Sequence, residues 1–561
     1  MISPAFRPCS GRRGPLPASL LVPLFVVGCT TPVDYLREAD ADAYTILGRA
    51  HEQVTGEQKA ESIGGHAGPL RRQMESDLAQ GLAPTVHLDI PATLDVAARN
   101  SRDFMRQKET LFRTALALST TRRDFELRWA GGTTAGVDGT GNGVDAVGTL
   151  SEDLSASVRS PSGTRVVASF VNNLFKNLLS GGDGVRESSL LGLTITQPLL
   201  RGAGARIVRE QLTQAERDVV YAVRSFERFR ATFAVDVFNT YLSLLEQIQN
   251  LESQRRNLDS VRRAREQIER LFAAGRRQIG DLDRARQNEL SAQNNLLNGE
   301  NQLQTSLDNL KEQLGLPMQA TIELDPAELQ RLSSTEVKPI DLDVDRAVAL
   351  ALSRRYDYRT ALDRVEDAAR QLFIAENALE STLDFSAAIT VPTEPGKALV
   401  FDWSQVSWSA GFDLGLALDR LIERNAYRAS FITLDERMRA RDELKDNITQ
   451  QIRLALRDIQ TRVQNWTIQK EAVTVAERRV DSQTRLYDAG RASALDLLDA
   501  QDSLLSANIS LTSATVDYTL SKLRLLRDLE GLAVQESGLR FDFDLPVPDG
   551  AQEVPDNRPR Q

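Results

Sequence analysis

Two long stretches of the chain carry apolar residues at steps of three and four. The first runs from Ala205 to Phe272 without a proline, and the second runs from Asp419 to Leu486. This spacing places the apolar side chains on one face of a helix, and at about 1.5 Å per residue each helix would reach about 100 Å. Each stretch ends at a turn that contains a glycine, Gly275 or Gly490, which is typical just past a helix C-terminus. We therefore expect two long amphipathic helices, each followed by a returning helix.

The two turn regions repeat one another. Residues 271–314 align with residues 486–529 at a constant offset of 215 positions, so that Gly275 falls on Gly490 and Asp281 on Asp496. Similarity at a long period indicates two copies of one supersecondary unit. The sequence therefore predicts a duplicated helical hairpin, an internal two-fold repeat.

A period of two precedes each helical stretch and predicts strands. Apolar residues alternate with small, polar or charged ones in residues 125–129, 191–196, 384–391 and 408–415. A soluble sheet on a core alternates in this way, and so does a membrane barrel with lipid outside and water inside. The barrel is favoured because the strands flank loops rich in Gly, Ser and Pro, 131–188 and 392–407, and lead into helices too long for a compact domain. Four strands per chain are too few to close a membrane barrel, so the barrel must be shared between chains.

The N-terminus resembles a bacterial lipoprotein signal. Arg12 and Arg13 form a basic region, residues 16–27 are apolar, and Val26-Val27-Gly28-Cys29 forms a small-residue cleavage site. The resemblance implies cleavage before Cys29 and lipidation of its thiol. The alternatives are an ordinary signal peptide with an incidental cysteine and a start codon placed too early. The apolar run is shorter than the roughly 20 residues that a helical span requires, and no later segment reaches that length without charges.

Composition limits the chemistry. The formal charge of −10 makes nucleic acid an improbable partner. The three histidines all precede the repeats, and the repeats contain no cysteine and no phosphate-binding glycine loop, so we expect no catalytic residues and no cofactor. The segment from Asp138 to Gly143 imitates the start of a calcium loop, but Thr149 stands where that loop needs Glu. We therefore expect no metal site.

The signal, the paired strands and the repeated turns together resemble the TolC-like outer-membrane efflux proteins. The most specific segments are Tyr487-Asp488-Ala489-Gly490, Asp496-Leu497-Leu498-Asp499-Ala500 and their counterpart from Gly280 to Arg286. The resemblance implies an α+β membrane protein. In that fold a long α-helical coiled-coil barrel continues into a transmembrane β-barrel, to which each chain of a homotrimer gives four strands. The implied partners are a periplasmic adaptor (a membrane fusion protein), an inner-membrane transporter and outer-membrane lipid.

The resemblance also suggests which residues form the periplasmic entrance. Matching positions are Asp496 and Asp499 for an acidic ring, with Asp281 and Tyr487 for links between neighbouring coils. Six carboxylates around one narrow lumen would favour cations over anions. Gly275 and Gly490 mark the hairpin turns expected to contact the adaptor. Alternatively, Asp281 and Asp496 are helix caps or first-turn acids, which favour the helix dipole and say nothing about a pore.

The elements suggest a division of the chain into six segments. These are a lipoprotein signal peptide 1–28, an N-terminal tether 29–92, a first repeat 93–316, a linker or equatorial segment 317–345, a second repeat 346–531, and an equatorial segment with a disordered tail 532–561.

Two functions fit these elements. The first is a passive export duct, lipid-anchored in the cell outer membrane with a periplasmic helical tunnel, serving a tripartite efflux or type I secretion system. The second is a lipid-anchored periplasmic coiled-coil adaptor or scaffold without a pore. Two hairpins, each preceded by its own strand pair, favour the duct. An enzyme finds no support in the residues.

Overall fold

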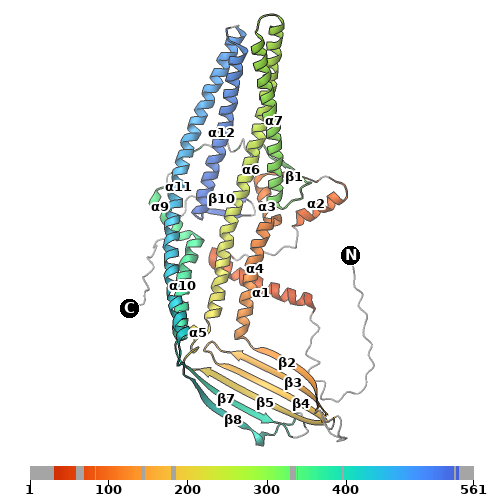
Figure 1. Ribbon diagram of the computed structural model, residues 1–561, viewed down its shortest axis with the longest axis vertical. Coiled ribbons are helices and arrows are strands. Elements are labelled where there is room, and N and C mark those ends of the chain that lie inside the picture. Colours follow the sequence, from red (N-terminus) through yellow and green to blue (C-terminus); the bar gives the residue numbers. More distant parts are fainter. Residues whose placement is uncertain are drawn as a thin grey trace. The chain divides into compact units, whose positions relative to one another are not determined.

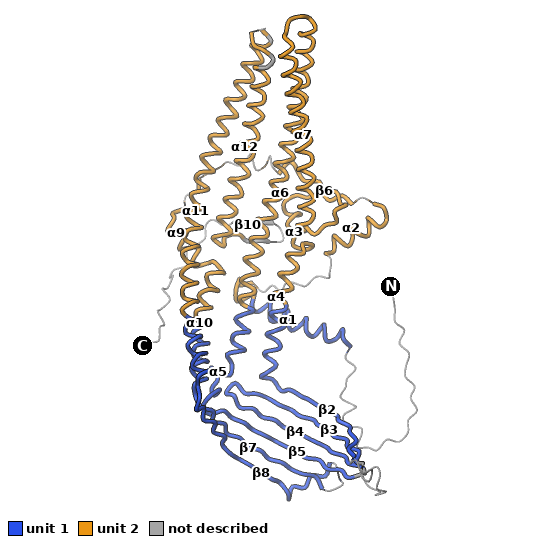
Figure 2. The backbone as a smooth tube through the Cα atoms, in the orientation of Figure 1, with its two compact units in different colours: residues 1–50, 113–219, 367–434 blue, residues 51–112, 220–366, 435–561 orange. Residues whose placement is uncertain are grey.

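The structure is a computed structural model. It describes residues 31–57, 68–82, 84–139, 146–177, 185–328, 331, 337, 339–340, 342–394, 397, 399–489, 491–535 and 538–541. The chain divides into two compact units, each built from segments far apart in sequence (Figure 2). Unit 1 comprises residues 1–50, 113–219 and 367–434, and unit 2 comprises residues 51–112, 220–366 and 435–561.

The predicted long helices are confirmed (Figure 1). The first is the 64-residue α6, Glu210–Ala273, which follows the short α5, Ala205–Val208, and returns as α7, Ile279–Leu314. The second is the 68-residue α11, Leu421–Asp488, which returns as α12, Ala494–Asp528. Their ends fall within a few residues of the predicted ones, because an unbroken apolar stripe bounded by turn residues defines a helix well. None of the described helices is both long and apolar enough to cross a membrane.

Unit 1 contains a six-stranded antiparallel sheet in the order β2-β3-β4-β5-β7-β8. The strands are β2, Arg128–Gly139; β3, Ala146–Arg159; β4, Arg165–Asn177; β5, Val185–Pro198; β7, Thr382–Pro392; and β8, Ser407–Gly415. The prediction of four strands per chain is therefore wrong, since the segment 131–188 is mostly strand and not a loop.

Two details explain the missed strands. In β3, Leu150, Leu154 and Val158 stand four residues apart, and Glu152 interrupts the alternation, so the glycines around the segment predict a loop. In β4, both Val166 and Val167 are apolar, which blurs a period of two.

The first predicted strand, 125–129, is displaced. The helix α4, Arg102–Arg122, continues into a 3-10 turn, Arg123–Phe125, and β2 begins only at Arg128. The Arg128 guanidinium donates a hydrogen bond back to the carbonyl oxygen of Arg123 at 3.0 Å. This contact holds the tighter turn in place of the extended backbone that the alternation predicts.

The predicted tether 29–92 forms regular structure in its described part. It contains α1, Pro32–Thr55; α2, Pro69–Ala79; β1, Thr85–Leu88; and the start of α3, Ile90–Asn100. Met74 and Leu88, each 2% exposed, belong to the hydrophobic core of unit 2. The part of the segment around Met74 and Leu88 therefore belongs to the folded unit 2 and is not a free linker.

The core of unit 2 forms around the middle of α6. Strand β1 pairs in parallel with β6, Thr321–Leu324, and apolar residues of α3, α6, α7 and α12 pack around this pair. Tyr241 of α6 is 1% exposed, and its hydroxyl donates a hydrogen bond to the carbonyl oxygen of Leu88 at 3.0 Å. Burial raises the pKa of Tyr241 to about 12, so this donor persists through the ordinary pH range.

A second core cluster of unit 2 joins α9, Val344–Arg354, to α11 and α12. The remaining named elements are α10, Tyr356–Asn377; a 3-10 turn, Trp403–Gln405; and the antiparallel pair of β9, Leu532–Gln535, with β10, Gly538–Phe541. A glycine is required at Gly315, just past α7, because its φ is +68° and a Cβ there would lie 2.1 Å from the carbonyl oxygen of Asn100.

A buried histidine makes unit 2 sensitive to pH. The ring nitrogens of His51, whose side chain is 7% exposed, lie 3.1 Å from a carboxylate oxygen of Glu227 and 2.8 Å from the carbonyl oxygen of Glu57. Two acceptors favour the doubly protonated ring, and the hydrogen bond with Glu227 raises the pKa of His51 above 6.5 although burial opposes it. The contribution of His51 to stability is therefore full below pH 6.5 and is lost as pH rises through the raised pKa.

We expect His51→Gln to weaken this pH dependence. In the wild type the melting temperature should fall between pH 6 and pH 8, and in the variant it should fall less, because glutamine does not titrate (about 1.4 kcal/mol per pKa unit). Thermal unfolding monitored by circular dichroism at both pH values tests this. His87→Gln is the matched control, because His87 is 79% exposed. An equal pH dependence in wild type and His51→Gln would contradict the assignment.

Candidate functional site

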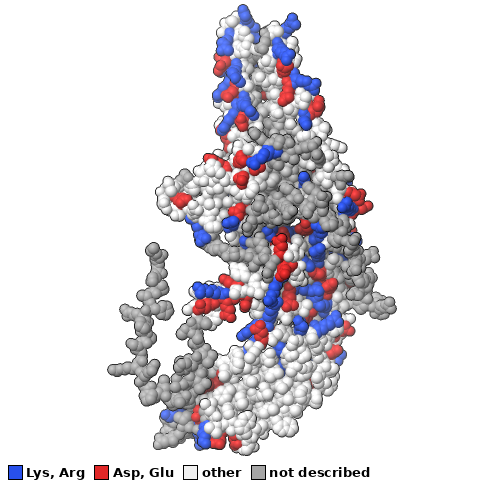
Figure 3. Space-filling view, turned by 180° about the vertical axis from the view of Figure 1, so that it is seen from behind, with Lys and Arg blue, Asp and Glu red and all other residues white. Residues whose placement is uncertain are grey.

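The sheet of unit 1 has one apolar face. Residues paired across an antiparallel sheet point to the same side. Trp129, Ala156, Ala168, Leu193, Ile389 and Trp408 form one such row across all six strands. The neighbouring row contains Leu154, Phe170, Leu191 and Val391. Figure 3 shows a broad surface over the sheet almost free of charged side chains, with charges near one end.

The opposite face of the sheet is polar. One of its rows contains Ser155, Ser169, Gly192 and Thr390, and another contains Ser157, Val167, Thr194, Ala388 and Ser409. Asp153, Asp384 and Asp413 also lie on this side. Large apolar side chains on one face and small or charged ones on the other are the pattern of a wall between lipid and water.

The first hairpin turn, between α6 and α7, closes on a left-handed glycine. Gly275 has φ +69°, and its amide donates to the carbonyl oxygen of Phe272 at 2.8 Å. Nothing lies within 4 Å of a Cβ built on Gly275, so the backbone conformation and not crowding favours glycine there. Asp281 lies in the first turn of α7, 3.9 Å from the guanidinium of Arg277. Its local role is that of a first-turn acid in a weak ion pair.

The second turn, between α11 and α12, is closed by a capping box. The side chain of Ser493 accepts from the amide of Asp496 at 3.2 Å, and the Asp496 carboxylate accepts from the amide of Ser493 at 2.9 Å and from its hydroxyl at 2.7 Å. These hydrogen bonds lower the pKa of Asp496, so the carboxylate is charged at neutral pH. Within the chain, Asp496 thus caps α12, as the alternative interpretation expected.

Asp499 and Tyr487 lie near the same turns. Asp499 is exposed, one turn further along α12 than Asp496. Tyr487 packs against the cluster of Ile268, Leu282 and Ala285 near the first turn, which links the two hairpins of unit 2. The structure therefore brings Tyr487 to the first hairpin, while Asp496 and Asp499 stay accessible to solvent.

The sequence interpretation missed one acid here. Asp502, three residues after Asp499, accepts a hydrogen bond from the side chain of Asn257, and partial burial raises its pKa although that bond opposes the shift. The sequence could have identified Asp502, because a spacing of three residues places Asp499 and Asp502 on one helix face.

Two predicted site residues, Cys29 and Gly490, lie outside the described residues. Among the residues that are described, no three His, Cys, Asp or Glu side chains gather into a possible metal site.

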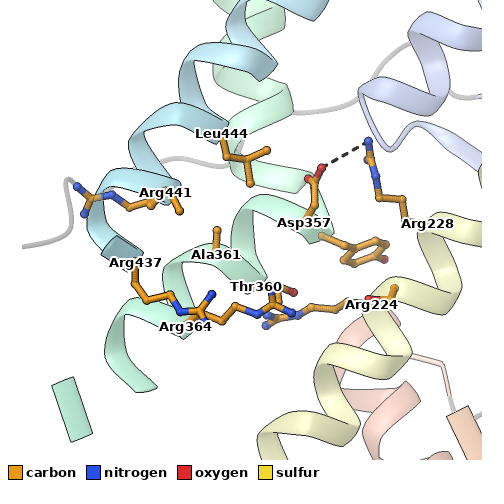
Figure 4. Close-up of a pocket in the computed structure, with 12 residues that line it drawn as sticks. Arg224, Arg228, Asp357, Thr360, Ala361, Arg364, Arg437, Arg441 and Leu444 are labelled. Atoms are coloured by element: carbon orange, nitrogen blue, oxygen red, sulfur yellow. Dashed lines mark ion pairs between the residues drawn. The ribbon is translucent and has the colours of Figure 1, made fainter. Parts of the chain in front are cut away.

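Unit 2 also contains an arginine-rich cavity of about 260 Å³ between α6, α10 and α11 (Figure 4). Its lining includes five arginines, Arg224, Arg228, Arg364, Arg437 and Arg441. Most of this charge is compensated nearby: Arg224 pairs with Asp363 at 2.5 Å, Arg228 with Glu530 at 2.8 Å, and Arg441 with Asp442 at 2.7 Å. The cavity is therefore best understood as part of an ion-pair network that joins these helices.

Asp357 is central to that network. Its carboxylate accepts two hydrogen bonds from the guanidinium of Arg355, at 3.1 and 2.7 Å, and lies 3.5 Å from Arg228. The side chain of Arg355 is only 3% exposed and also donates to Gln451 of α11 at 2.9 Å. Burial alone would raise the pKa of Asp357, but the bonds from Arg355 and the charge of Arg228 lower it overall.

Part of the chain matches a known protein family. The family described as outer membrane efflux protein matches residues 155–316, a segment that holds β4, β5, α6 and α7. Over this segment the chain resembles the TolC-like outer membrane efflux proteins.

Solved structures of similar fold cover most of the chain. The CmeC outer membrane channel of Campylobacter jejuni is 13% identical, with a TM-score of 0.59, and the match covers 87% of this chain and 91% of CmeC. The outer membrane protein VceC of Vibrio cholerae is 18% identical, with a TM-score of 0.57 and coverage of 78% and 95%. CusC is 14% identical, with a TM-score of 0.56 and coverage of 78% and 91%. No curated protein matches the sequence. The chain therefore shares its fold with several outer membrane channels of low sequence identity.

Proposed function

We propose that three copies of this efflux protein form a passive export duct in the outer membrane. The strands of the three sheets would close one transmembrane barrel, and the long hairpins would form a periplasmic tunnel. The two-faced sheet of unit 1 carries this proposal, because a wall between lipid and water needs one apolar and one polar face. The match of residues 155–316 to the outer membrane efflux protein family supports it.

Exposed apolar residues along the long helices also favour assembly. Six of them are 43–65% exposed in the single chain: Leu290, Leu297, Ile432, Leu454, Ile468 and Val475. Exposed apolar rows on a helix are typical of surfaces that pack against further helices. A ring of copies would bury them.

In this proposal the hairpin turns form the periplasmic entrance and contact an adaptor, which couples the duct to an inner-membrane pump. Asp496 and Asp499 would face the lumen as an acidic ring, while Asp281 and Tyr487 would link neighbouring coils. The capping box at Asp496 is compatible with this role, because its carboxylate stays charged and exposed.

Conductance measurements test the duct. We expect the purified protein in planar bilayers to form cation-selective channels. The double variant Asp496→Ala/Asp499→Ala should shift the reversal potential in a salt gradient toward zero, because the entrance loses its negative potential. Asp95→Ala is the control, since Asp95 lies on α3 and pairs with Arg99 away from the hairpin turns. Absence of any conductance would favour the lipid-anchored adaptor instead, and unchanged selectivity in the variant would leave both aspartates as helix-stabilising acids.

The proposed lipid anchor at Cys29 needs its own test. Metabolic labelling with a radioactive fatty acid should label the wild type and not Cys29→Ser, because the thiol is the acylated group. Cys9→Ser serves as the control, since Cys9 precedes the cleavage site. Persistent label on Cys29→Ser would exclude the anchor.

A further inference from the structure

The β3–β4 hairpin is an integral part of the sheet. β3 pairs with β2 from Gly139↔Ala146 to Arg128↔Ser157, and β4 pairs with β5 from Lys176↔Val185 to Arg165↔Thr196. The two strands pair with each other over the same length. The hairpin therefore stands between β2 and β5 as a continuous part of the wall and not as a loop attached to it.

The hairpin also continues both faces of the sheet. On the apolar side it contributes Leu150, Leu154, Val158, Val166, Phe170 and Leu174. On the polar side it contributes Ser151, Asp153, Ser155, Ser157, Ser169 and Asn173. Glu152 and Asn172 interrupt this apolar side in one half of the hairpin. In the other half, Leu154 to Val158 of β3 and Val166 to Phe170 of β4 keep it apolar, so that half has the composition of a lipid-facing wall.

The edges of the sheet are suited to joining copies of this chain. Among the described strands, β2 and β8 each pair on one side only. Neither contains a lysine or an internal proline, the residues that commonly protect a free edge. Both expose large aromatic side chains: Trp129 of β2 is 65% exposed, and Trp408 and Phe412 of β8 are 77% and 69% exposed.

The strand directions permit such joining. The strands alternate in direction across the sheet, and six is an even number, so β2 and β8 run in opposite directions. When β8 of one copy lies beside β2 of the next, the contact is antiparallel and the alternation continues. The contact is also head-to-tail, which closes into a ring when the rotation between copies permits it.

We propose that β2 of each copy pairs with β8 of the next and that the resulting barrel has eighteen strands, six from each of three copies. This inference rests on the threefold assembly of the proposed function. Barrel diameter grows roughly linearly with strand number, so the lumen is about 1.5 times as wide as that of a twelve-stranded barrel and about twice its cross-section. The lumen is lined by the small polar residues of the polar face and admits bulky hydrated solutes at the outer mouth.

A deletion within the chain supplies a matched comparison. Removing residues 146–184 takes away β3 and β4, keeps residues 140–145 as the connection, and leaves β2 next to β5. Because two strands are removed, β2 and β5 remain antiparallel, and the register chain Arg128↔Ser157↔Val167↔Thr194 keeps Arg128 and Thr194 on one face. The deleted chain would form a twelve-stranded barrel in the same trimer.

Electron cryomicroscopy of the full chain and of the deleted chain in lipid discs tests the proposal. We expect eighteen strands for the full chain, twelve for the deleted chain, and a mean barrel diameter larger by about 1.5-fold in the full chain. In planar bilayers the largest polyethylene glycol that enters from the outer side should be smaller for the deleted chain. Ser155→Ala/Ser157→Ala, which leaves the strand number unchanged, should retain the wild-type limit.

The outcomes separate the two proposals. A trimer whose barrel has fewer than eighteen strands, with β3 and β4 outside the wall, overturns this inference and leaves the duct intact. A full chain that forms no ring of copies overturns both. The strand count of the full chain decides the question even if the deleted chain does not fold.

Discussion

Replacing Asp357 with alanine should lower the free energy of unfolding by about 3–5 kcal/mol, because it leaves the buried guanidinium of Arg355 without a countercharge. Arg355 is 3% exposed and directs two of its hydrogen bonds to this carboxylate. Urea unfolding followed by circular dichroism in detergent measures the loss. Glu376→Ala, an exposed acid on the same helix α10, should change the free energy by less than about 0.5 kcal/mol.

A compensating variant distinguishes the lost charge pair from a general packing defect. In Arg355→Met/Asp357→Leu both charges are gone, so most of the loss should be recovered. If the double variant is no more stable than Asp357→Ala, the desolvated arginine is not the cause. The lowered pKa of Asp357 also determines how its contribution to the free energy of unfolding depends on pH. That contribution is full above the ordinary aspartate pKa and is lost only as pH falls through the lowered value.

Tyr241→Ala should have an effect of similar size, about 3–5 kcal/mol, because it leaves a large cavity in the main core of unit 2. Tyr241→Phe is the matched control. It keeps the ring and removes only the hydroxyl that donates to Leu88, so its cost should be about 1 kcal/mol. The same urea experiment measures both. Equal losses for the two variants would mean that the hydrogen bond, and not the packing of the ring, determines the contribution of Tyr241.

The parts of the fold that could be predicted are those in which apolar residues recur at a regular spacing along the sequence. An apolar stripe at helical spacing defined α6 and α11, and alternation located β5, β7 and β8. The strand β3 was missed because Glu152 interrupts its alternation and because the glycine and serine content around it suggested a loop. Composition is a weaker guide than period wherever a strand has a face of small residues.

Features that depend on distant partners could not be predicted. Nothing near Arg355 in the sequence shows that Gln451 of another helix completes its burial. At the hairpin turns the sequence identified the acids but left the roles of Asp281 and Asp496 open between capping and gating. The structure shows the cap at Asp496, a local interaction, while the proposed lumen would form only between copies.

Each compact unit is built from segments that are far apart in the sequence, and this arrangement slows the folding of the chain. The core of unit 2 joins Met74 near one end of the chain to Leu532 near the other, and β1 finds its only described strand partner, β6, across more than two hundred residues. Contacts between such distant positions make folding slow, because long loops must close before the contacts can form. A chain released from the ribosome only as far as α11 still lacks Val516, Leu520 and Leu523 of that core. Its apolar surfaces stay uncovered until synthesis is nearly complete, and uncovered apolar surface makes a growing chain prone to aggregation.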